Sequence, residues 1–414
     1  MKLLKVAVLA DFLEEGWPSM DLVADMLIER LGAEHAGAVL PTLVRPPMRR
    51  RAQALPVPGD KQARAAYALD RAANRFWYYP REVARIADRF DVFHIVDHSY
   101  AHLVHSLPGA RTVVTCHDLD AFRAILEPHK EKRSMTFRAA ARHTLQGLAK
   151  AGHVTCDTAA TRDGLVERAG IAETRTSVVY NGPHPSCSPA REPAADLEAH
   201  RLLGSDRPTI DLLHVGSTIA RKRIDVLLRI VASVRQSHPT VRLVRVGGPF
   251  NAPQRALCRD LGLHDAVVVL PFLDRSTLAA VYRRSAVVLM PSDREGFGLP
   301  VLEALACGTP VVASDISALR EVGGAAAVYC PPGDVGAWTE AVTAALEDRR
   351  LHPDGWRARQ TAGLAQAASF SWSRYTSAMV AVYRRLVRDA EARQSCGTTR
   401  AELIRAEPPV RNQL

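Results

Sequence analysis

The chain has 414 residues, which is long enough for two domains that each bury their own core. Its composition, 47% hydrophobic and 24% charged, is typical of a globular protein, and no apolar run reaches the roughly 18–20 residues of a membrane-spanning helix. The net charge of +10 is spread along the chain without a basic-aromatic nucleic-acid motif. We therefore expect no nucleic acid partner, and rather a polyanionic small ligand or an anionic membrane surface.

The seven cysteines are scattered and contain no C-x-x-C pair. This pattern favours free thiols in a reducing cytoplasm over a disulfide framework or a zinc site. The apolar start of the chain ends at Asp11, and two glutamates follow, so we interpret it as a first β-strand and not as a signal peptide.

In the first half of the chain, short apolar runs alternate with helical patterns, which is typical of a parallel sheet. Strands are predicted at residues 5–10, 92–95, 113–116, 153–156 and 176–180, and helices at 20–31, 80–89, 100–105 and 161–169. We assign residues 1–190 to a first Rossmann-like domain. The polar, proline-bearing residues 191–208 are expected to form a linker.

A second alternation follows over residues 209–368 and predicts a second Rossmann-like domain. Its strands are expected at 212–215, 241–246, 267–270, 287–290, 311–313 and 327–329, with helices at 225–237, 253–261, 276–284 and 335–368. Residues 369–390 are expected to contain one more amphipathic helix and residues 391–414 a flexible tail. The predicted fold class is α/β, with two doubly wound parallel sheets that face each other across a cleft.

The segment Glu295-Gly-Phe-Gly-Leu-Pro-Val-Leu-Glu303 links a predicted strand to a predicted helix. Pro300 suits the first turn of that helix, and the loop lies at the carboxyl edge of the sheet, where open α/β sheets bind ligands. Free amides at a helix N-terminus favour an anion, and the two carboxylates favour hydroxyl groups. A nucleotide-sugar satisfies both demands.

Two cations follow another strand of the second half. Arg221 and Lys222 come after Gly216 and before a helical pattern, so they are expected at the same sheet edge. Negative charge grows on a nucleoside diphosphate as it departs. Cations there would therefore stabilise the transition state more strongly than the ground state.

These segments together resemble the retaining glycosyltransferases of family 4, which have the GT-B fold. Residues 295–303 match the E-x7-E signature of that family, residues 214–228 resemble its phosphate-binding loop, and residues 114–119 its N-terminal histidine loop. Val179-Tyr-Asn-Gly182 resembles the domain junction, and residues 370–376 the start of the helix that crosses back to the N-terminal domain. The likeness extends to about residue 390.

The resemblance implies that the first domain binds the acceptor and the second the donor. Glu303 would accept hydrogen bonds from the ribose, and Arg221 and Lys222 would serve the diphosphate. His117 would lie near the donor sugar and the acceptor. The remaining residues expected at the donor are Gly216, Ser217, Phe272, Leu273, Glu295, Gly296, Phe297, Gly298 and Leu299, with Gly16 in the first N-terminal loop. Many family members have arginine where this chain has Ser217, so Arg221, Lys222 and Arg223 all remain candidates for the diphosphate.

The reaction implied is transfer of a sugar from a nucleoside diphosphate sugar to a hydroxyl acceptor with retention at the anomeric carbon. Glu295, His117, Arg221 and Lys222 are the catalytic candidates, and Glu295 or the leaving phosphate could assist the incoming hydroxyl. The alternatives are a GT-B epimerase and a non-catalytic protein that binds a nucleotide-sugar or a membrane surface. A pyridoxal-phosphate phosphorylase is disfavoured because no lysine follows Lys222. The base, the sugar and the acceptor stay open, as does the oligomeric state.

No metal or other cofactor is expected. Asp118-Leu-Asp120 has the D-x-D spacing of metal-dependent glycosyltransferases of another fold, but this tripeptide is common. The histidines at 94, 98, 102 and 105 lack a carboxylate to complete a zinc pattern. Basic residues at 45–51 and 123–143 could contact anionic lipid at the inner face of the membrane, or form solvated surfaces.

Overall fold

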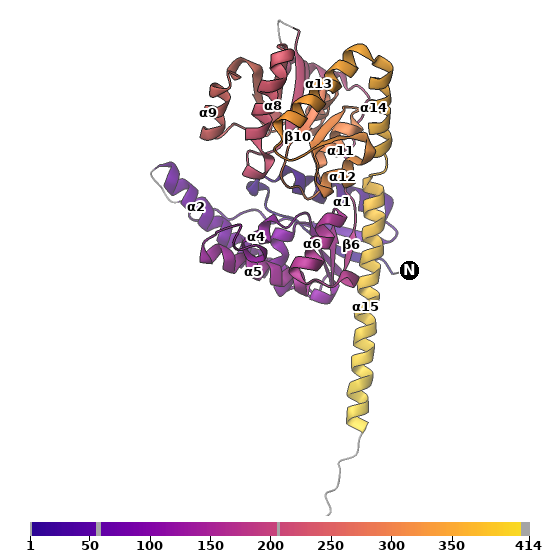
Figure 1. Ribbon diagram of the computed structural model, residues 1–414. Coiled ribbons are helices and arrows are strands. Elements are labelled where there is room, and N and C mark those ends of the chain that lie inside the picture. Colours follow the sequence, from indigo (N-terminus) through magenta and orange to yellow (C-terminus); the bar gives the residue numbers. More distant parts are fainter. Residues whose placement is uncertain (1, 55–58, 205–207, 407–414) are drawn as a thin grey trace, which may run out of the picture. The chain divides into compact units, whose positions relative to one another are not determined.

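The computed structural model describes residues 2–54, 59–204 and 208–406, with side chains through Arg393. Its contacts divide the chain into two compact units. The first contains Met1–Asp157, Thr161–Val179 and Ser373–Leu414, and the second contains Thr158–Ala160 and Tyr180–Trp372. Each unit has a six-stranded parallel sheet with helices packed against it (Figure 1).

The first unit has the strand order β2-β1-β3-β4-β5-β6. Its strands are β1 (Leu4–Leu9), β2 (Val39–Val44), β3 (Val92–Ile95), β4 (Thr112–Cys116), β5 (His153–Cys156) and β6 (Thr176–Val178). Its helices are α1 (Pro18–Glu34), α2 (Asp60–Ala73), α3 (Tyr79–Arg85), α4 (Arg123–Leu126), α5 (Met135–Lys150), α6 (Ala159–Ala169) and α15 (Trp372–Ala406). Short helices of other types are η1 (Leu13–Glu15), η2 (Asn74–Tyr78), η3 (His98–Ser106), η4 (Gly109–Arg111), η5 (Asp120–Phe122) and η6 (Glu173–Arg175), of which η2 is a π-helix.

The second unit has the order β12-β11-β10-β7-β8-β9. Its strands are β7 (Ile210–Val215), β8 (Val241–Val246), β9 (Val267–Leu270), β10 (Val287–Met290), β11 (Val311–Ser314) and β12 (Val328–Cys330). Its helices are α7 (Pro193–Leu203), α8 (Ile224–Ser237), α9 (Ala252–Asp260), α10 (Arg275–Arg284), α11 (Leu299–Ala306), α12 (Ser317–Gly323), α13 (Val335–Leu351) and α14 (Pro353–Ala367), with the short helices η7 (Ala220–Lys222), η8 (His264–Ala266) and η9 (Gly324–Ala326).

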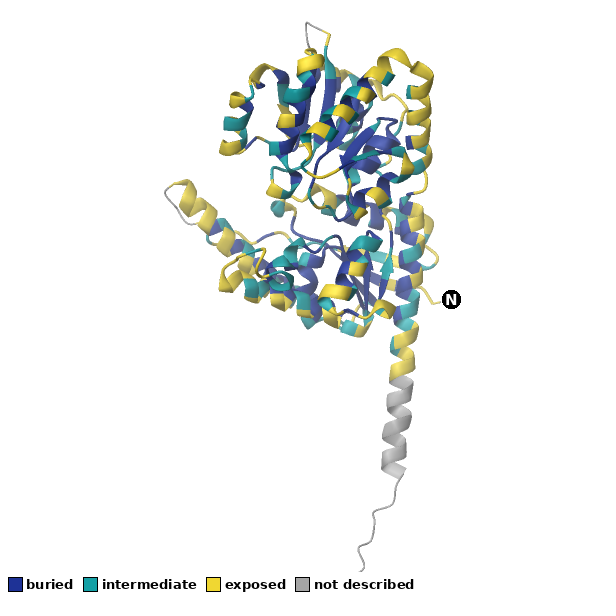
Figure 2. Ribbon diagram, viewed as in Figure 1, coloured by how far each residue is buried: buried dark blue, intermediate teal, exposed yellow. Residues whose placement is uncertain are grey.

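Alternate residues of each buried strand enter opposite layers of the second unit. In β10, Val288 and Met290 pack with α10 and α11, whereas Val287 and Leu289 pack with α8 and α13. Such continuous apolar strands are expected when helices cover both faces of a parallel sheet. The strands β8, β10 and β11 are accordingly buried along their whole length, whereas the edge strands β9 and β12 are partly exposed (Figure 2).

The strand orders define where each sheet can bind a ligand. In the second sheet the order of the strands reverses at the neighbouring pair β7 and β10, which is the switch point of this sheet. In the first sheet the switch point lies between β1 and β3. Loops that leave these neighbouring strands diverge to opposite faces and leave room for a ligand at the carboxyl edge. Arg221 and Glu295 follow β7 and β10, and Asp11 and Asp97 follow β1 and β3.

The local structure differs from the expectations at two places. Residues 191–208 were expected to be a linker, but α7 occupies Pro193–Leu203, because Ala195, Ala199 and Leu203 repeat every four residues and are buried. The tail expected from residue 391 is helical as far as Ala406, whereas residues 407–414 lie outside the described part of the chain. The segment 335–368, which was expected to be helical, consists of α13 and α14, and the two helices meet at His352, just before Pro353.

The edge strand β2 and the helices α2 and α5 were not predicted. Pro41 lies inside β2, and proline disrupts a strand pattern although an edge strand tolerates it. The helix α15 is anchored to the first sheet by His94, whose ring nitrogens lie 2.7 Å from the Tyr383 hydroxyl and 2.7 Å from the Thr115 hydroxyl.

Candidate active site

Glu295 is the centre of a buried ion-pair cluster in the second unit. Its carboxylate accepts hydrogen bonds from Lys222 Nζ at 2.6 Å and from Arg221 Nη1 at 2.8 Å. The Glu295 side chain is 6% exposed. Burial would raise the pKa of this carboxyl group, but Lys222 and Arg221 outweigh burial and hold the pKa below its ordinary value. The two predicted cations and one predicted carboxylate therefore meet in one place.

The loops after β7 and β10 are joined by further bonds that involve Arg223. Its guanidinium contacts both oxygens of Asp225, at 3.1 and 3.0 Å, and Asp293 at 2.9 Å. The backbone adds a bond from the Asp293 amide to the Arg221 carbonyl at 2.8 Å. Arg223 is thus engaged by two carboxylates, whereas Arg221 and Lys222 share the single carboxylate of Glu295.

The glycine loop before α11 presents backbone donors. The amides of Phe297, Gly298 and Leu299 make no hydrogen bond with any described residue. Gly298 has φ of +99°, and a Cβ atom there would lie 2.5 Å from Leu319 Cδ2. Only glycine fits this position, so the sequence enforces a turn whose amides precede a helix N-terminus, an arrangement that suits an anion.

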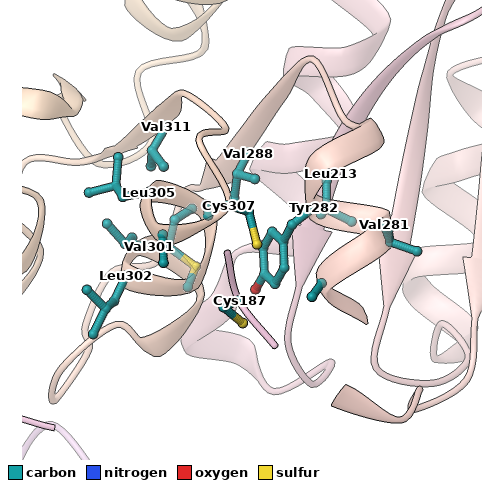
Figure 3. Packing of buried hydrophobic residues seen from close by; sticks show 14 of the residues in the cluster. Cys187, Leu213, Val281, Tyr282, Val288, Val301, Leu302, Leu305, Cys307 and Val311 are labelled. Carbon is teal, nitrogen blue, oxygen red and sulfur yellow. The ribbon is translucent and has the colours of Figure 1, made fainter. Parts of the chain in front are cut away.

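Glu303 lies in the second turn of α11 and is buried. The Tyr282 hydroxyl donates a 2.8 Å hydrogen bond to its carboxylate. Burial raises the pKa of Glu303 to about 7, although Tyr282 and Arg275 act in the opposite direction. Figure 3 shows the Tyr282 ring packed among the aliphatic side chains of this layer, with its hydroxyl end on the side of Cys187. Tyr282 was not predicted because its sequence context is that of an ordinary core helix.

The other residues expected at the donor divide between surface and core. Phe272 follows β9 and is 59% exposed, so its ring does not fill the core. Leu273 is partly buried and packs against the core of the second unit. The ring of Phe297 is buried and lies 5.9 Å from the Phe370 ring, so only the backbone of Phe297 can face a ligand. Gly216 has φ of +157° at the end of β7, and Ser217 is half-buried beside it.

His117 follows β4 in the first unit, and both of its ring nitrogens are occupied. Nδ1 donates to Asp157 at 2.5 Å and Nε2 donates to the Val96 carbonyl at 2.6 Å. Burial would lower the pKa of His117, but Asp157, Asp97 and the Val96 carbonyl raise it to about 9. The imidazolium is therefore held inside the unit, and the histidine fixes the loop at the sheet edge.

The loop after β1 is held by a second network. The Glu15 carboxylate contacts Arg71 at 2.9 Å and Arg75 at 3.1 Å, and Gly16 takes a left-handed conformation with φ of +67°. Apart from Gly16 and its two chain neighbours, no described atom lies within 4 Å of where a Gly16 Cβ would stand. Gly16 therefore ends the short helix η1 and turns the chain toward α1.

Asp11 is a carboxylate of this edge that the sequence did not single out. It follows β1, is 1% exposed, and neither oxygen has a hydrogen-bond partner among the described residues. Burial, together with Asp97 and Asp21, raises the pKa of Asp11 to about 7. A buried carboxylate without donors is costly for folding, which is typical of a group kept for a ligand.

Two family descriptions match the chain, each over one half. Residues 24–186 match "Glycosyltransferase Family 4", and residues 198–360 match "Glycosyl transferases group 1". A D-inositol 3-phosphate glycosyltransferase of Streptosporangium roseum is 30% identical over 311 residues, which cover 71% of this chain and 69% of that protein. The chain belongs to glycosyltransferase family 4. The resemblance inferred from residues 295–303 and their companions is thereby confirmed.

Other relatives of this family-4 chain carry the same description. The protein of Gordonia bronchialis is 34% identical over 261 residues, and that of Xylanimonas cellulosilytica is 37% identical over 223 residues. These alignments cover 60% and 52% of this chain, and 55% and 50% of the relatives, so the chain matches about half of their length.

Solved structures share the fold of this family-4 chain. Anabaena Alr3699/HepE in complex with UDP and glucose has a TM-score of 0.68 at 17% identity, and covers 92% of this chain and 99% of its own. WaaG, a glycosyltransferase of lipopolysaccharide biosynthesis, has a TM-score of 0.65 at 15% identity, with the same coverage. The expected GT-B class of two doubly wound sheets is confirmed. No helix in the described residues is both long and apolar enough to cross a membrane.

Proposed function

We propose that this family-4 chain transfers a sugar from a nucleoside diphosphate sugar to a hydroxyl group of an acceptor, with retention at the anomeric carbon. The second unit binds the donor. The observation that carries the proposal is the cluster at the switch point of the second sheet, in which Glu295 contacts Lys222 at 2.6 Å and Arg221 at 2.8 Å.

In this proposal, Lys222 and Arg221 bind the diphosphate and stabilise the charge that grows on it as the glycosidic bond breaks. The amides of Phe297, Gly298 and Leu299, which bond to no described residue, donate hydrogen bonds to the donor where its phosphate joins its sugar. Glu303 accepts hydrogen bonds from the ribose. Two ion pairs already engage Glu295. This favours a role in holding the cations over a role as covalent nucleophile, so the leaving phosphate would deprotonate the incoming hydroxyl on the same face.

UDP-sugars are the first donors to test, because HepE, which shares the fold, binds UDP and glucose. Purified protein is incubated with UDP-, GDP- and ADP-sugars labelled in the sugar, together with a lipid-free cell extract or a lipid extract. Label in a new product supports transfer. Tight donor binding without transfer to either extract supports the alternative of a non-catalytic binding protein, and conversion of the free donor to an epimer supports a GT-B epimerase.

The acceptor is expected at the carboxyl edge of the first sheet, where the carboxylate of Asp11 has no hydrogen-bond partner among the described residues. D-inositol 3-phosphate is the first small acceptor to assay, because the curated relatives are described as acting on it. The cation Arg45 lies at the end of the neighbouring strand β2, since Leu9 and Val44 pair in register. Opposite charges on adjacent strands suit an acceptor with both hydroxyl and phosphate groups.

Peripheral contact with anionic lipid, at the inner face of the membrane, is a further part of the proposal. On the first unit, Leu69 and Trp77 are 66% and 56% exposed, and the Arg81 guanidinium lies 3.3 Å from the centre of the Trp77 ring. Much of α2 is exposed as well (Figure 2). Aromatic and basic groups together are suited to a membrane interface. In the 123–143 segment, by contrast, Arg123, Lys130 and Arg133 pair with Glu127 or Glu131, so this segment is the weaker candidate.

Sedimentation with vesicles tests the membrane contact. Wild-type protein should sediment with phosphatidylglycerol vesicles and less with phosphatidylcholine, and Trp77→Ala with Arg81→Ala should reduce sedimentation. Leu197→Ala, at a 70% exposed residue of α7, is the control that should sediment like wild type. Equal sedimentation of all variants would contradict this contact. A cytoplasmic location is consistent with six described cysteines that are all buried free thiols.

A further inference from the structure

Arg245 is an arginine in the interior of the donor-binding unit that forms no ion pair within the described chain. It lies in β8, opposite His214 of β7 in the parallel register, and its exposed fraction is 0%. Its Nε atom has no hydrogen-bond partner among the described residues. A buried guanidinium is normally neutralised by a carboxylate, and the missing counter-ion has to be explained.

The guanidinium of Arg245 binds the backbone of two glycine turns. Nη2 donates to the Gly216 carbonyl at 2.8 Å and to the Gly247 carbonyl at 3.3 Å, and Nη1 donates to the Gly248 carbonyl. The turns are themselves in contact, because a Cβ atom on Gly247 would lie 2.1 Å from the Gly216 oxygen. Arg245 thus links the end of β7 to the end of β8 through carbonyl groups alone.

The hydrogen bond from Arg245 to the Gly216 carbonyl fixes the direction of the Ser217 N–H. The described residues contain no cis peptide bond, so the carbonyl of Gly216 and the N–H of Ser217 point in opposite directions. With the carbonyl directed inward to Arg245, the Ser217 N–H is directed away from it. That amide makes no hydrogen bond with the described residues, and Ser217 is half-buried. A free amide backed by a buried cation is suited to an anion.

Two other basic side chains lie near Gly216, and neither of them supplies an unpaired positive charge there. Lys222 passes close by, because its Cε would lie 3.4 Å from a Cβ on Gly216, and it is paired with Glu295. His214 is buried with neither ring nitrogen bonded to the described residues, and burial, Lys222 and Arg245 lower its pKa to about 3, so it is neutral. Arg245 therefore contributes a full charge beneath the loop, whereas the Lys222 charge is shared with Glu295.

We propose that Arg245 is a positioning residue for the diphosphate of the donor: it orients the Ser217 amide toward the phosphates and supplies, from inside the sheet, a positive charge at the loop position where this chain has serine. The inference rests on the proposed donor site and deepens it. The charge need not touch the ligand, since a buried charge in a low-dielectric interior acts over several ångströms.

Binding of phosphate probes to variants tests the inference. Titration calorimetry with UDP, GDP, ADP and inorganic pyrophosphate identifies the best nucleotide for wild type, and its parent nucleoside is then included. Arg245→Met should weaken the nucleotide and pyrophosphate by about tenfold to a hundredfold, the range of a charged hydrogen bond, and leave the nucleoside within about twofold. A purely structural role would weaken the nucleoside as much as the nucleotide.

Charge rescue is the sharper comparison. Ser217→Arg added to Arg245→Met restores a cation at the loop and should recover at least half of the lost affinity on a logarithmic scale. The control is Arg242→Met with Asp211→Asn, which removes another buried pair from the same strands, where Arg242 Nε lies 2.6 Å from Asp211. This control should bind the nucleotide like wild type.

The outcomes separate the inference from the function on which it rests. If wild type binds none of the nucleotides, both fail. If wild type binds and Arg245→Met binds equally well, or loses nucleoside and nucleotide alike without rescue, the inference alone fails. If Arg245→Met does not fold, Arg245→Lys is the decisive variant. The single nitrogen of lysine cannot bond to both the Gly216 and the Gly248 carbonyls, so nucleotide binding should weaken by about threefold to tenfold. Unchanged nucleotide binding would overturn the inference.

Discussion

Lys222 and Glu295 are 73 positions apart in the chain, yet Lys222 Nζ lies 2.6 Å from the Glu295 carboxylate at the point where the second sheet reverses its order. Because Glu295 also contacts Arg221, one carboxylate holds two cations. The Glu295 carboxylate therefore fixes the positions of the two positive charges that a ligand would meet.

Replacement of the lysine should affect turnover most strongly. Lys222→Met removes charge from the developing diphosphate, so kcat should fall by about 10²–10³-fold with a folded protein. Glu295→Gln keeps the shape but releases both cations, and kcat should fall by about tenfold or more. Steady-state kinetics with the donor identified above measure both, and Arg229→Met on α8 serves as a control outside the cluster. Wild-type kcat in Lys222→Met would remove Lys222 from the site.

Donor affinity should depend on pH through Glu303. Its pKa is about 7 in the folded protein, and a ribose hydroxyl donates to the ionised form. Binding should therefore strengthen as the pH rises from about 6 to 8, the range around that pKa. Glu303→Gln should bind more weakly by about tenfold at pH 8 and lose this pH dependence.

Tyr282→Phe tests the cause of that dependence. The Tyr282 hydroxyl lowers the pKa of Glu303 by donating to it, so its removal should move the inflection to higher pH. Calorimetric titrations at several pH values check both variants. A flat wild-type profile would show that Glu303 does not titrate in the donor site.

The His117–Asp157 pair should make stability depend on pH. The pKa of His117 is raised from 6.5 to about 9, so its contribution is fully present below pH 6.5 and is lost as the pH rises through 9. Asp157→Asn removes the charge that raises this pKa, and it should cost about 3–5 kcal/mol of unfolding free energy at pH 7 because a buried pair is broken. Thermal unfolding between pH 6 and 10 measures the effect, and an unchanged slope in Asp157→Asn would refute the assignment.

Asp11→Asn should make the protein more stable and less active. The folded protein holds the pKa of Asp11 at about 7, above its ordinary value of 3.8, so this group costs stability as the pH rises from about 4 to 7. Asparagine removes the buried charge, and the unfolding free energy at pH 8 should rise by about 1–3 kcal/mol while transfer to the acceptor falls. Asp25→Asn, a more exposed neighbour of Arg45, is the control. A less stable Asp11→Asn variant would contradict this prediction.

The sequence predicted the two parallel sheets because buried strands such as Val287–Met290 are continuous apolar runs between helical patterns. It also placed Glu295 and Lys222 at one sheet edge from their positions after strands. The helix α7 was missed because its buried face is mostly alanine, a weak hydrophobic signal.

Contacts between distant segments could not be predicted. Tyr282 and Arg245 occupy positions that look like ordinary helix and strand residues, and only the packed structure brings the first to Glu303 and the second to Gly216. The expectation that the His117 ring faces a ligand from the sheet edge did not anticipate that Asp157 and Val96 would occupy both nitrogens.

The helix α15 has a practical consequence for dissecting the protein. Residues from Ser373 onward belong to the first unit, although the second unit lies between them and the rest of that unit in the chain. A fragment that stops near residue 190 would leave His94 without the hydroxyl of Tyr383 that covers it. Isolating the N-terminal half would therefore require a circularly permuted or spliced gene that carries residues 373–393 along.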